Sequence, residues 1–529
     1  MERPLAHKAV RLAMIPVGQD SATDDRRSPR VAPRVDHVEW LVDNAAAYDA
    51  ILHAIGGARQ SVWISQLAFD ADCTAHAGPP PGSESLGAPR NLLDALISVS
   101  AARGVDVRIL LNASLLLDTA TPLRAHLERV GASGISVRGV GRFPQLLHAK
   151  MVIVDDREAF LVGSPFVNGY WDDECHKPVD ARRPVRELGG RPLHDVSTHV
   201  RGAAVARLGD AFAELWNDAS HGAHGVDLVR RPQREPAADR SSAIRVACTT
   251  PRRVAQPGLH GRTEILTELR RALAGARSHV YIEHQYLSAR PVIDALAAAL
   301  DRSPALEIVV VLNQNPDVTA YRGWQNERLR ESGLLGHPRV GLFTLWSVAP
   351  DETRPGVRLV NQIFVHSKVV TVDDHWATVG SANLDGVSLH SYGDDFSGRL
   401  GRRVFRDVRN FDVNIVLDAQ RGLVSRAVRT LRTRLWHEHL GTFAECGVSR
   451  PDGGWLSRWR TAAARGVAAL NRDVTSTSTL VLPYSMRSTP RAQLEHAGVR
   501  VDDARLDLCF NPGWLEVHFS PSWVRNMFA

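Results

Sequence analysis

The stretch HSKVVTVDDHWATVGSAN, residues 366–383, combines the chemistry and the folding signals that decide how this chain is built. Residues 365–372 alternate as a half-buried β-strand does, the Asp-Asp pair that begins at Asp373 predicts a turn, and a second strand then leads to Gly-Ser-Ala-Asn. Side chains two positions apart on a strand share a face, so His366 and Lys368 project together. The stretch therefore predicts a hairpin that presents a histidine and a lysine, with the first aspartate as a supporting residue.

A second copy of this stretch, HAKMVIVDDREAFLVGS, occupies residues 148–164. The two histidines are separated by 218 positions (366 − 148), and so are Ala58 and Ala276 (276 − 58), which lie in Gly-Ala-Arg segments before apolar runs. Equal spacings predict an internal duplication, with two halves built to one plan. The matching residues of the first and second copy are His148 and His366, Lys150 and Lys368, Asp155 and Asp373, and Ser164 and Ser381.

Strands alternate with helices in each half, which predicts an α/β fold. We expect two similar α/β sandwich lobes, each a mixed sheet flanked by helices, related by a pseudo-two-fold axis within one chain. The polar stretch 171–191 predicts a surface loop close to the first hairpin. The predicted divisions are a flexible leader at 1–35, a first lobe at 36–230, a second lobe at 231–442 and a C-terminal extension at 443–529.

Composition narrows the possible partners and the cellular location. A chain of 529 residues with 44% hydrophobic content can bury the cores of two lobes. The net charge of +6 favours anionic partners such as phosphate diesters or acidic lipid surfaces, although Arg-rich codon usage would raise it equally. With no apparent signal peptide and no apolar stretch of membrane-spanning length, the sequence predicts a cytoplasmic protein that is soluble or associates with membranes peripherally. We also expect a monomer.

The five cysteines indicate neither a disulfide framework nor a metal site, because they are scattered and lack CxxC spacing. The pair Cys175-His176 has no second ligand pair nearby in the sequence. We therefore expect no bound metal and no other cofactor.

Two His-Lys pairs that meet in one cleft can cleave a phosphodiester without a metal. One imidazole attacks phosphorus while the other, protonated, gives its proton to the departing oxygen, and the lysines neutralise the non-bridging oxygens. A neutral imidazole also needs an acceptor that selects its tautomer. Asp195 and Asp412 are the candidates, since each lies 32 positions beyond the glycine of its hairpin (195 − 163 and 412 − 380) on the polar face of a predicted strand.

The doubled HxKxxxxD motif, at residues 148–155 and 366–373, resembles the phospholipase D superfamily. The segments YIEHQYL at 281–287, WHEHLG at 436–441 and RPLHDVSTHVRGAAV at 191–205 are similar to its eukaryotic-type members. The resemblance covers roughly residues 45–445 and implies the fold described above.

This resemblance also implies roles for individual residues. His148 corresponds to the nucleophile that forms a phosphohistidine, and His366 to the general acid and base. Two departures from the family pattern are the late position of Asn168 after its Gly-Ser turn and Val387-Ser388 in place of an Arg-Ser pair. The remaining implied roles are phosphate binding by Lys150, Lys368, Asn383, Ser164 and Ser381, and histidine support by Asp195 and Asp412.

The leading functional hypothesis is a phospholipase D that hydrolyses glycerophospholipids at a membrane surface to phosphatidic acid, or transfers the phosphatidyl group to alcohols. A cardiolipin synthase-like phosphatidyltransferase is the alternative, although such enzymes usually carry N-terminal membrane spans. A metal-independent nuclease is a third reading, favoured by the positive charge. Nucleic acid is nevertheless not the expected partner, because nucleases of this type are often single-motif chains that dimerise. A scaffold with a dead site would have lost His or Lys from one copy, and both copies are intact.

Overall fold

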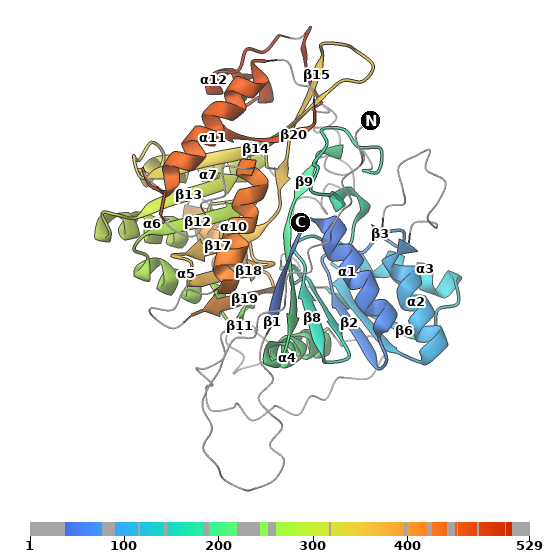
Figure 1. Cartoon of the computed structure of the whole chain (residues 1–529). Coiled ribbons are helices and arrows are strands. Elements are labelled where there is room, and N and C mark those ends of the chain that lie inside the picture. Colours follow the sequence, from blue (N-terminus) through green and yellow to red (C-terminus); the bar gives the residue numbers. More distant parts are fainter. Residues whose placement is uncertain are drawn as a thin grey trace, which may run out of the picture.

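Each half of the chain forms its own mixed β-sheet, and the two sheets lie next to each other in one molecule (Figure 1). The boundaries predicted near residues 35, 230 and 442 fall outside the described residues, so the predicted division into domains stays a prediction. The structure is a computed structural model that describes residues 37–76, 90–114, 117–141, 145–183, 190–219, 244–251, 261–316, 319–395, 399–419, 426–441, 450–451, 453–472, 476–502 and 504–509.

Seven strands of each half follow the same order and the same directions. In both sheets the first four pairings are antiparallel and the last two are parallel, which confirms the predicted duplication and the mixed α/β fold. In spatial order, the first sheet is β1 (His37–Val42), β10 (Val196–Arg201), β8 (Glu158–Leu161), β7 (Met151–Val154), β2 (Ser61–Ser65), β5 (Asp106–Asn112) and β6 (Ile135–Val140). The second is β11 (Ile244–Thr249), β19 (Asp412–Asp418), β18 (Trp376–Gly380), β17 (Lys368–Val372), β12 (His279–His284), β13 (Glu307–Leu312) and β14 (Val340–Pro350).

The second sheet is longer because three further strands extend it beyond β14. Strand β15 (Arg358–Gln362) and strand β20 (Ser478–Pro483) both pair antiparallel with β14, and β21 (Leu506–Leu508) pairs parallel with β15. Strands β20 and β21 belong to the predicted C-terminal extension, so its described part is continuous with the second sheet. Two short pairs complete the strands: β9 (Leu193–His194) with β16 (Phe364–Val365), and β3 (Thr74–His76) with β4 (Arg90–Asn91).

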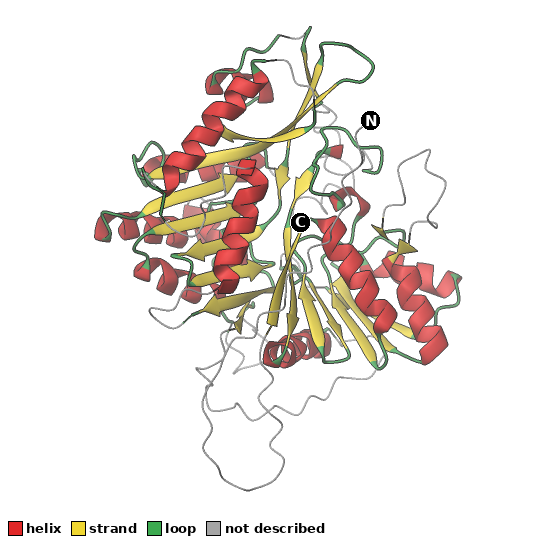
Figure 2. Ribbon diagram, viewed as in Figure 1, coloured by secondary structure: helices red, strands yellow, loops and turns green. Residues whose placement is uncertain are grey.

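Helices cover both faces of each sheet (Figure 2). Alternation along a strand explains this: on β2, Val62 and Ile64 pack against α1, α2 and α3, whereas Trp63 between them faces the opposite core. The helices are α1 (Asn44–Gly57), α2 (Leu92–Arg103), α3 (Ala120–Arg129), α4 (Ala203–Asp218), α5 (Glu264–Gly275), α6 (Arg290–Arg302), α7 (Thr319–Glu331), α8 (Gly386–Leu389), α9 (Arg399–Val404), α10 (Arg426–Leu440), α11 (Trp455–Leu470) and α12 (Pro490–Ala497), with short 3₁₀ turns η1 (Asn168–Tyr170) and η3 (Tyr392–Asp395).

One hydrophobic core is shared by the two lobes, which we define as the two sheets with their helices. It joins Trp63 and Phe212 of the first lobe to Phe343 and Trp436 of the second, and includes Trp459 of α11. Because these side chains form one buried cluster, the lobes are held together by burial of apolar surface.

The Asp-Asp turn of each hairpin holds the loop that leads into a neighbouring strand, which is β2 in the first sheet and β12 in the second. Both aspartates of each turn have positive φ, which Asp tolerates better than most residues. The Asp155 carboxylate accepts three backbone N–H groups, from Arg59, Gln60 and Ser61, at 2.7–2.9 Å. Asp373 does the same for residues 277–279 at 2.7–2.8 Å.

Two expectations about local structure were wrong in part. In the described part of the predicted surface loop 171–191, Asp172, His176 and Arg183 are buried, so the loop lies only partly on the surface. The strand predicted over 365–372 is broken after Val365, since that end pairs with β9 of the first lobe while β17 stays in the second sheet. Strands β1 and β11 and helix α7 were not expected from the sequence.

Replacing Asp155 or Asp373 by Ala should lower the free energy of unfolding by about 1–3 kcal/mol, because three backbone hydrogen bonds to a charged acceptor are lost. Denaturant titration measures this change. The matched Asp→Asn variants keep one acceptor oxygen and should lie between the parent and the Ala variants. Equal stability of parent and Ala variants would show that these contacts contribute nothing.

Candidate active site

The two predicted histidines lie at the seam between the lobes, and each is held by backbone from the other half. The His148 N–H donates to the Phe411 carbonyl at 3.0 Å, next to a parallel bridge between Leu147 and Phe411. On the other side, the His366 N–H donates to the His194 carbonyl at 2.8 Å, where β16 pairs with β9. The seam thus places one histidine from each hairpin in equivalent surroundings.

Each imidazole is oriented by an aspartate that also comes from the other half. His148 Nδ1 lies 2.7 Å from Asp412 Oδ1, and His366 Nδ1 lies 2.9 Å from Asp195 Oδ2. An ionised carboxylate only accepts, so Nδ1 carries the hydrogen and Nε2 keeps its lone pair. Burial alone would raise the pKa of both aspartates, but contact with the histidines holds the pKa of each below its usual value.

The Gly-Ser turns complete this arrangement by holding the aspartates. Ser381 Oγ donates to Asp412 at 2.7 Å, and Ser164 Oγ donates to Asp195. A side chain on Gly163 would collide with the Asp195 carboxylate, which explains why glycine precedes the serine. Each hydroxyl has one hydrogen and gives it to an aspartate, and the expected phosphate binding by Ser164 and Ser381 stays a prediction.

The two lysines lie beside the histidines of their own motifs. Lys150 Nζ donates to the His148 carbonyl at 3.2 Å, and Lys368 Nζ lies 3.1 Å from His366 Nε2. All four side chains are at most 1% exposed. Low solvent exposure strengthens every charge interaction among them.

The pKa shifts show that the two His-Lys pairs act on each other. Burial and the charge of Lys150 lower the pKa of His148, with a further contribution from Lys368. Burial and the charge of Lys368 lower the pKa of His366 to about 4, and Lys150 contributes as well. Burial and the charge of Lys368 also hold the pKa of Lys150 well below its usual range. Both imidazoles are therefore neutral at pH 7, and the repulsion between the two lysines favours an anion bound beside them.

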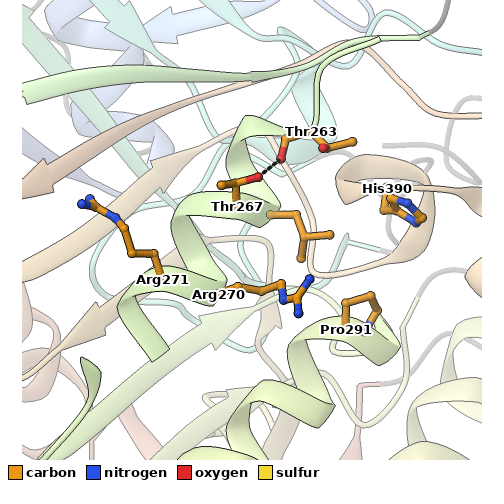
Figure 3. A pocket seen from close by; sticks show the side chains of 7 residues that line it. Thr263, Thr267, Arg270, Arg271, Pro291 and His390 are labelled. Atoms are coloured by element: carbon orange, nitrogen blue, oxygen red, sulfur yellow. Dashed lines mark hydrogen bonds between the residues drawn. The ribbon is translucent and has the colours of Figure 1, made fainter. Parts of the chain in front are cut away.

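A separate surface hollow of about 590 Å³ lies on the second lobe, between α5, the start of α6 and the residue that follows α8 (Figure 3). The side chains of neither motif line it. The lining residues are Thr263, Leu266, Thr267, Arg270, Arg271, Pro291 and His390.

Comparison with known proteins supports the resemblance read from the motifs. A family profile described as "Cardiolipin synthase, PLD-like domain" matches residues 51–165 and again residues 269–395, one match in each half. The chain belongs to the phospholipase D superfamily. Members are phosphodiester-processing proteins, so a phosphodiesterase site at the seam agrees with the family.

Relatives within the superfamily include two differently named enzymes. The chain is 24% identical to phospholipase D A of Dictyostelium discoideum over 486 residues, which is 79% of this chain and 37% of that protein. It is 26% identical to cardiolipin synthase A of Pseudomonas aeruginosa over 376 residues, 69% of this chain and 63% of that protein. It therefore spans less than two thirds of either relative. A phosphatidylserine synthase structure from Haemophilus influenzae aligns with a TM-score of 0.48 at 12% identity, over 75% of this chain and 85% of that one.

Not every residue of the superfamily motif lies with the histidines. Asp155 and Asp373 stand at the far ends of their strands, about 20 Å from the histidines by strand rise, and hold backbone amides instead. Their supporting role is therefore to hold the backbone that precedes strands β2 and β12. Asn383 is buried, with no hydrogen-bond partner for Oδ1 among the described residues, and its phosphate-binding role stays a prediction. Asn168 instead accepts from the Thr74 N–H at 2.8 Å and holds a loop.

Several residues at the seam were not assigned a role from the sequence. The Tyr170 ring lies edge-on to His366 with centroids 5.1 Å apart, and Asn44 Nδ2 donates to Ser164 Oγ at 2.8 Å. Glu283, inside YIEHQYL, accepts from Ser367 and from His439, which lies inside WHEHLG. Glu283 and His439 both lie in segments that resemble eukaryotic-type members, so the sequence did mark them. A single sequence does not show that these two residues are in contact.

Replacing Asp412 by Asn should slow cleavage of bis(p-nitrophenyl) phosphate by about 10³- to 10⁴-fold, because the amide can present N–H to His148 Nδ1 and favour the wrong tautomer. Initial-rate kinetics at pH 7 measure the effect. Asp418→Asn, on the same strand but at its partly exposed end, is the matched control and should match the parent. Similar rates for all three proteins would remove Asp412 from the site.

Proposed function

We propose that this chain is a phospholipase D-type phosphodiesterase that converts glycerophospholipids to phosphatidic acid at a membrane surface, through a phosphohistidine intermediate. The observation that supports it is the pair of imidazoles at one seam, each oriented by an aspartate of the opposite half at 2.7 and 2.9 Å. Two such histidines, each with a lysine beside it, provide a nucleophile, an acid and charge neutralisation.

The first step forms the covalent intermediate. The Nε2 lone pair of His148 attacks phosphorus, and a P–N bond forms as the P–O bond to the headgroup breaks. The Nδ1–H of the same ring remains hydrogen-bonded to Asp412, which stabilises the positive charge that develops on the imidazole. Protonated His366 transfers its Nε2 proton to the departing alkoxide, so the headgroup leaves as a neutral alcohol. Lys150 and Lys368 offset the charge on the non-bridging oxygens.

The second step reverses the proton transfer. Neutral His366 accepts a proton from water as the water oxygen attacks phosphorus, the P–N bond breaks and phosphatidic acid is released. An alcohol that replaces water gives a phosphatidyl alcohol by the same bond changes. Whether the product is an acid or a diester is therefore set by which acceptor reaches the intermediate.

The low pKa of His366 is consistent with an acid that becomes charged only when substrate binds. Its pKa, lowered to about 4 by burial and Lys368, leaves the ring neutral at pH 7 without substrate. A phosphate diester carries one negative charge, and placed between the lysines it offsets the repulsion that lowers this pKa. Substrate binding then favours protonation of the acid that the first step requires.

Phosphatidyl transfer as in a cardiolipin synthase is the second candidate. It is favoured by the family profile on both halves and by the cardiolipin synthase relative. The site and the intermediate would be the same, but the acceptor would be the headgroup hydroxyl of a second phospholipid. A buried site that limits access of water would favour such a transfer.

Vesicles that contain phosphatidylcholine, phosphatidylethanolamine and phosphatidylglycerol, in ¹⁸O-labelled water with EDTA and ethanol, distinguish these reactions by mass spectrometry. Phosphatidic acid that carries ¹⁸O, together with phosphatidylethanol, is the expected result. Cardiolipin made from phosphatidylglycerol would instead support the second candidate. A folded chain that turns over no phospholipid would contradict both, and EDTA-resistant cleavage of DNA would then favour a nuclease.

The two histidines should fail in different ways when replaced by Ala. His148→Ala should abolish covalent labelling by a ³²P-labelled phospholipid, since no nucleophile remains. His366→Ala should slow choline release by about 10²- to 10⁴-fold but affect the better leaving group p-nitrophenol much less. His375→Ala, in the turn of the same hairpin, is the control and should behave as the parent. Near-parental labelling of His148→Ala would overturn the assignment of the nucleophile.

A further inference from the structure

Four buried or partly buried side chains converge at the seam, beside the histidine pair. They are Asp43, His176 and His194 of the first lobe and Glu438 of α10 in the second. His194 Nδ1 lies 3.0 Å from Asp43 Oδ1 and 2.9 Å from Glu438 Oε1. His176 Nε2 lies 3.4 Å from the same Glu438 oxygen and 3.6 Å from Asp43 Oδ2. The donor atoms all lie within 4.8 Å of one another, the separation expected around one shared ion.

Hydrogen bonds satisfy this group only in part: they join His194 Nδ1 to Asp43 and His176 Nε2 to Glu438, and they leave one carboxylate oxygen without a donor. The single hydrogen that His194 Nδ1 can carry faces two carboxylate oxygens, and it can bond well to only one of them. Asp43 Oδ2 is buried and has no hydrogen-bond partner among the described residues, with His176 Nε2 beyond hydrogen-bond range. An unpaired buried carboxylate oxygen is costly, and it points into the space that the four side chains share.

The outer nitrogen of each imidazole meets a further carboxylate. His176 Nδ1 forms a hydrogen bond of 3.0 Å with Asp172 Oδ2. His194 Nε2 lies 2.8 Å from Glu283 Oε1, an ion-pair contact without hydrogen-bond geometry. A carboxylate on the far nitrogen of an imidazole is the usual support of a metal-binding histidine, because it orients the ring and makes the inner nitrogen more basic. Arg183 holds Asp172 in turn, at 2.5 Å.

We propose that Asp43, His176, His194 and Glu438 bind one divalent transition-metal ion, with zinc the best match. Two imidazole nitrogens and two carboxylate oxygens are ligands that zinc accepts in tetrahedral sites. Four protein ligands complete the tetrahedral coordination of the ion, and none of them belongs to the two His-Lys motifs. The ion is therefore structural. This site is independent of the proposed function, and it revises the expectation from the sequence that the chain binds no metal.

The alternative group at this seam, His194 with Glu283 and His439, is a less suitable site. Glu283 already accepts hydrogen bonds from Ser367, from Tyr281 at 2.6 Å and from His439 at 2.8 Å. Its carboxylate is satisfied without an ion. Cys175 is exposed and is not part of either group.

An ion at this point would join elements that are far apart in the chain. It would tie the start of α1, the segment around His176, strand β9 and helix α10. Since Asp195 directly follows His194 and holds the imidazole of His366 at 2.9 Å, the ion would also restrain a residue that orients the active-site histidine. A structural metal between lobes contributes its binding free energy to folding.

Metal analysis of the untagged full chain, purified from zinc-supplemented culture, tests the proposal. Plasma mass spectrometry should find about one zinc ion per chain, and X-ray absorption should show nitrogen and oxygen neighbours at about 2.0–2.2 Å. After removal of the metal, added zinc at a hundredfold excess over its dissociation constant should raise Tm by roughly 2–3 °C.

Variants separate this site from incidental binding. Glu438→Gln and His176→Gln should lose the zinc and the Tm response. His199→Gln is the matched control, because its ring also lies between two carboxylates, at 2.7 Å from Glu158 and 3.4 Å from Glu39, but outside the cluster. It should keep both. A parent chain that neither retains zinc nor responds to it, zinc retained by both variants, or sulfur neighbours in the absorption spectrum would each overturn the proposal.

Discussion

The exchange of aspartates across the seam is the constraint on which the rest of the structure depends. A buried imidazole needs an acceptor to define its tautomer, and here the acceptor of each histidine is supplied by the opposite half. Neither half could therefore orient its own histidine alone. The shared hydrophobic core beneath the seam keeps the two lobes at the separation that these 2.7 and 2.9 Å contacts require.

Duplication produces this exchange of aspartates from one set of residues that occurs in both halves. In each half the same strand order brings the hairpin histidine, the Gly-Ser turn and the aspartate to one end of the sheet. When two such ends pair about a pseudo-two-fold axis, both exchanges form together: the first half supplies Asp195 to His366, and the second half supplies Asp412 to His148. The fold thus builds a two-histidine site by repeating one plan.

The symmetry fails beside the site, where the proposed metal cluster lies. The residue before the active-site aspartate is His194 in the first half and Phe411 in the second, and Glu283 on β12 corresponds to Ser65 on β2. One side of the seam therefore carries a buried polar network, while the other carries an aromatic side chain and a hydroxyl that donates to the Ala149 carbonyl. The two sheets also differ in size, because β15, β20 and β21 extend the second sheet and have no counterpart in the first.

The sequence alone determined the duplication, the two hairpins, and the shared face of each histidine and lysine, because strand alternation and repeat spacing are local properties of a chain. It also identified Asp195 and Asp412 as histidine partners, but not which histidine each would hold. Only the tertiary structure decided that the pairing crosses the seam, that Asp155 and Asp373 hold backbone instead of imidazoles, and that Asp43 meets Glu438. Such contacts depend on how two complete sheets pack, and residues nearly four hundred positions apart leave no periodic signal of their meeting.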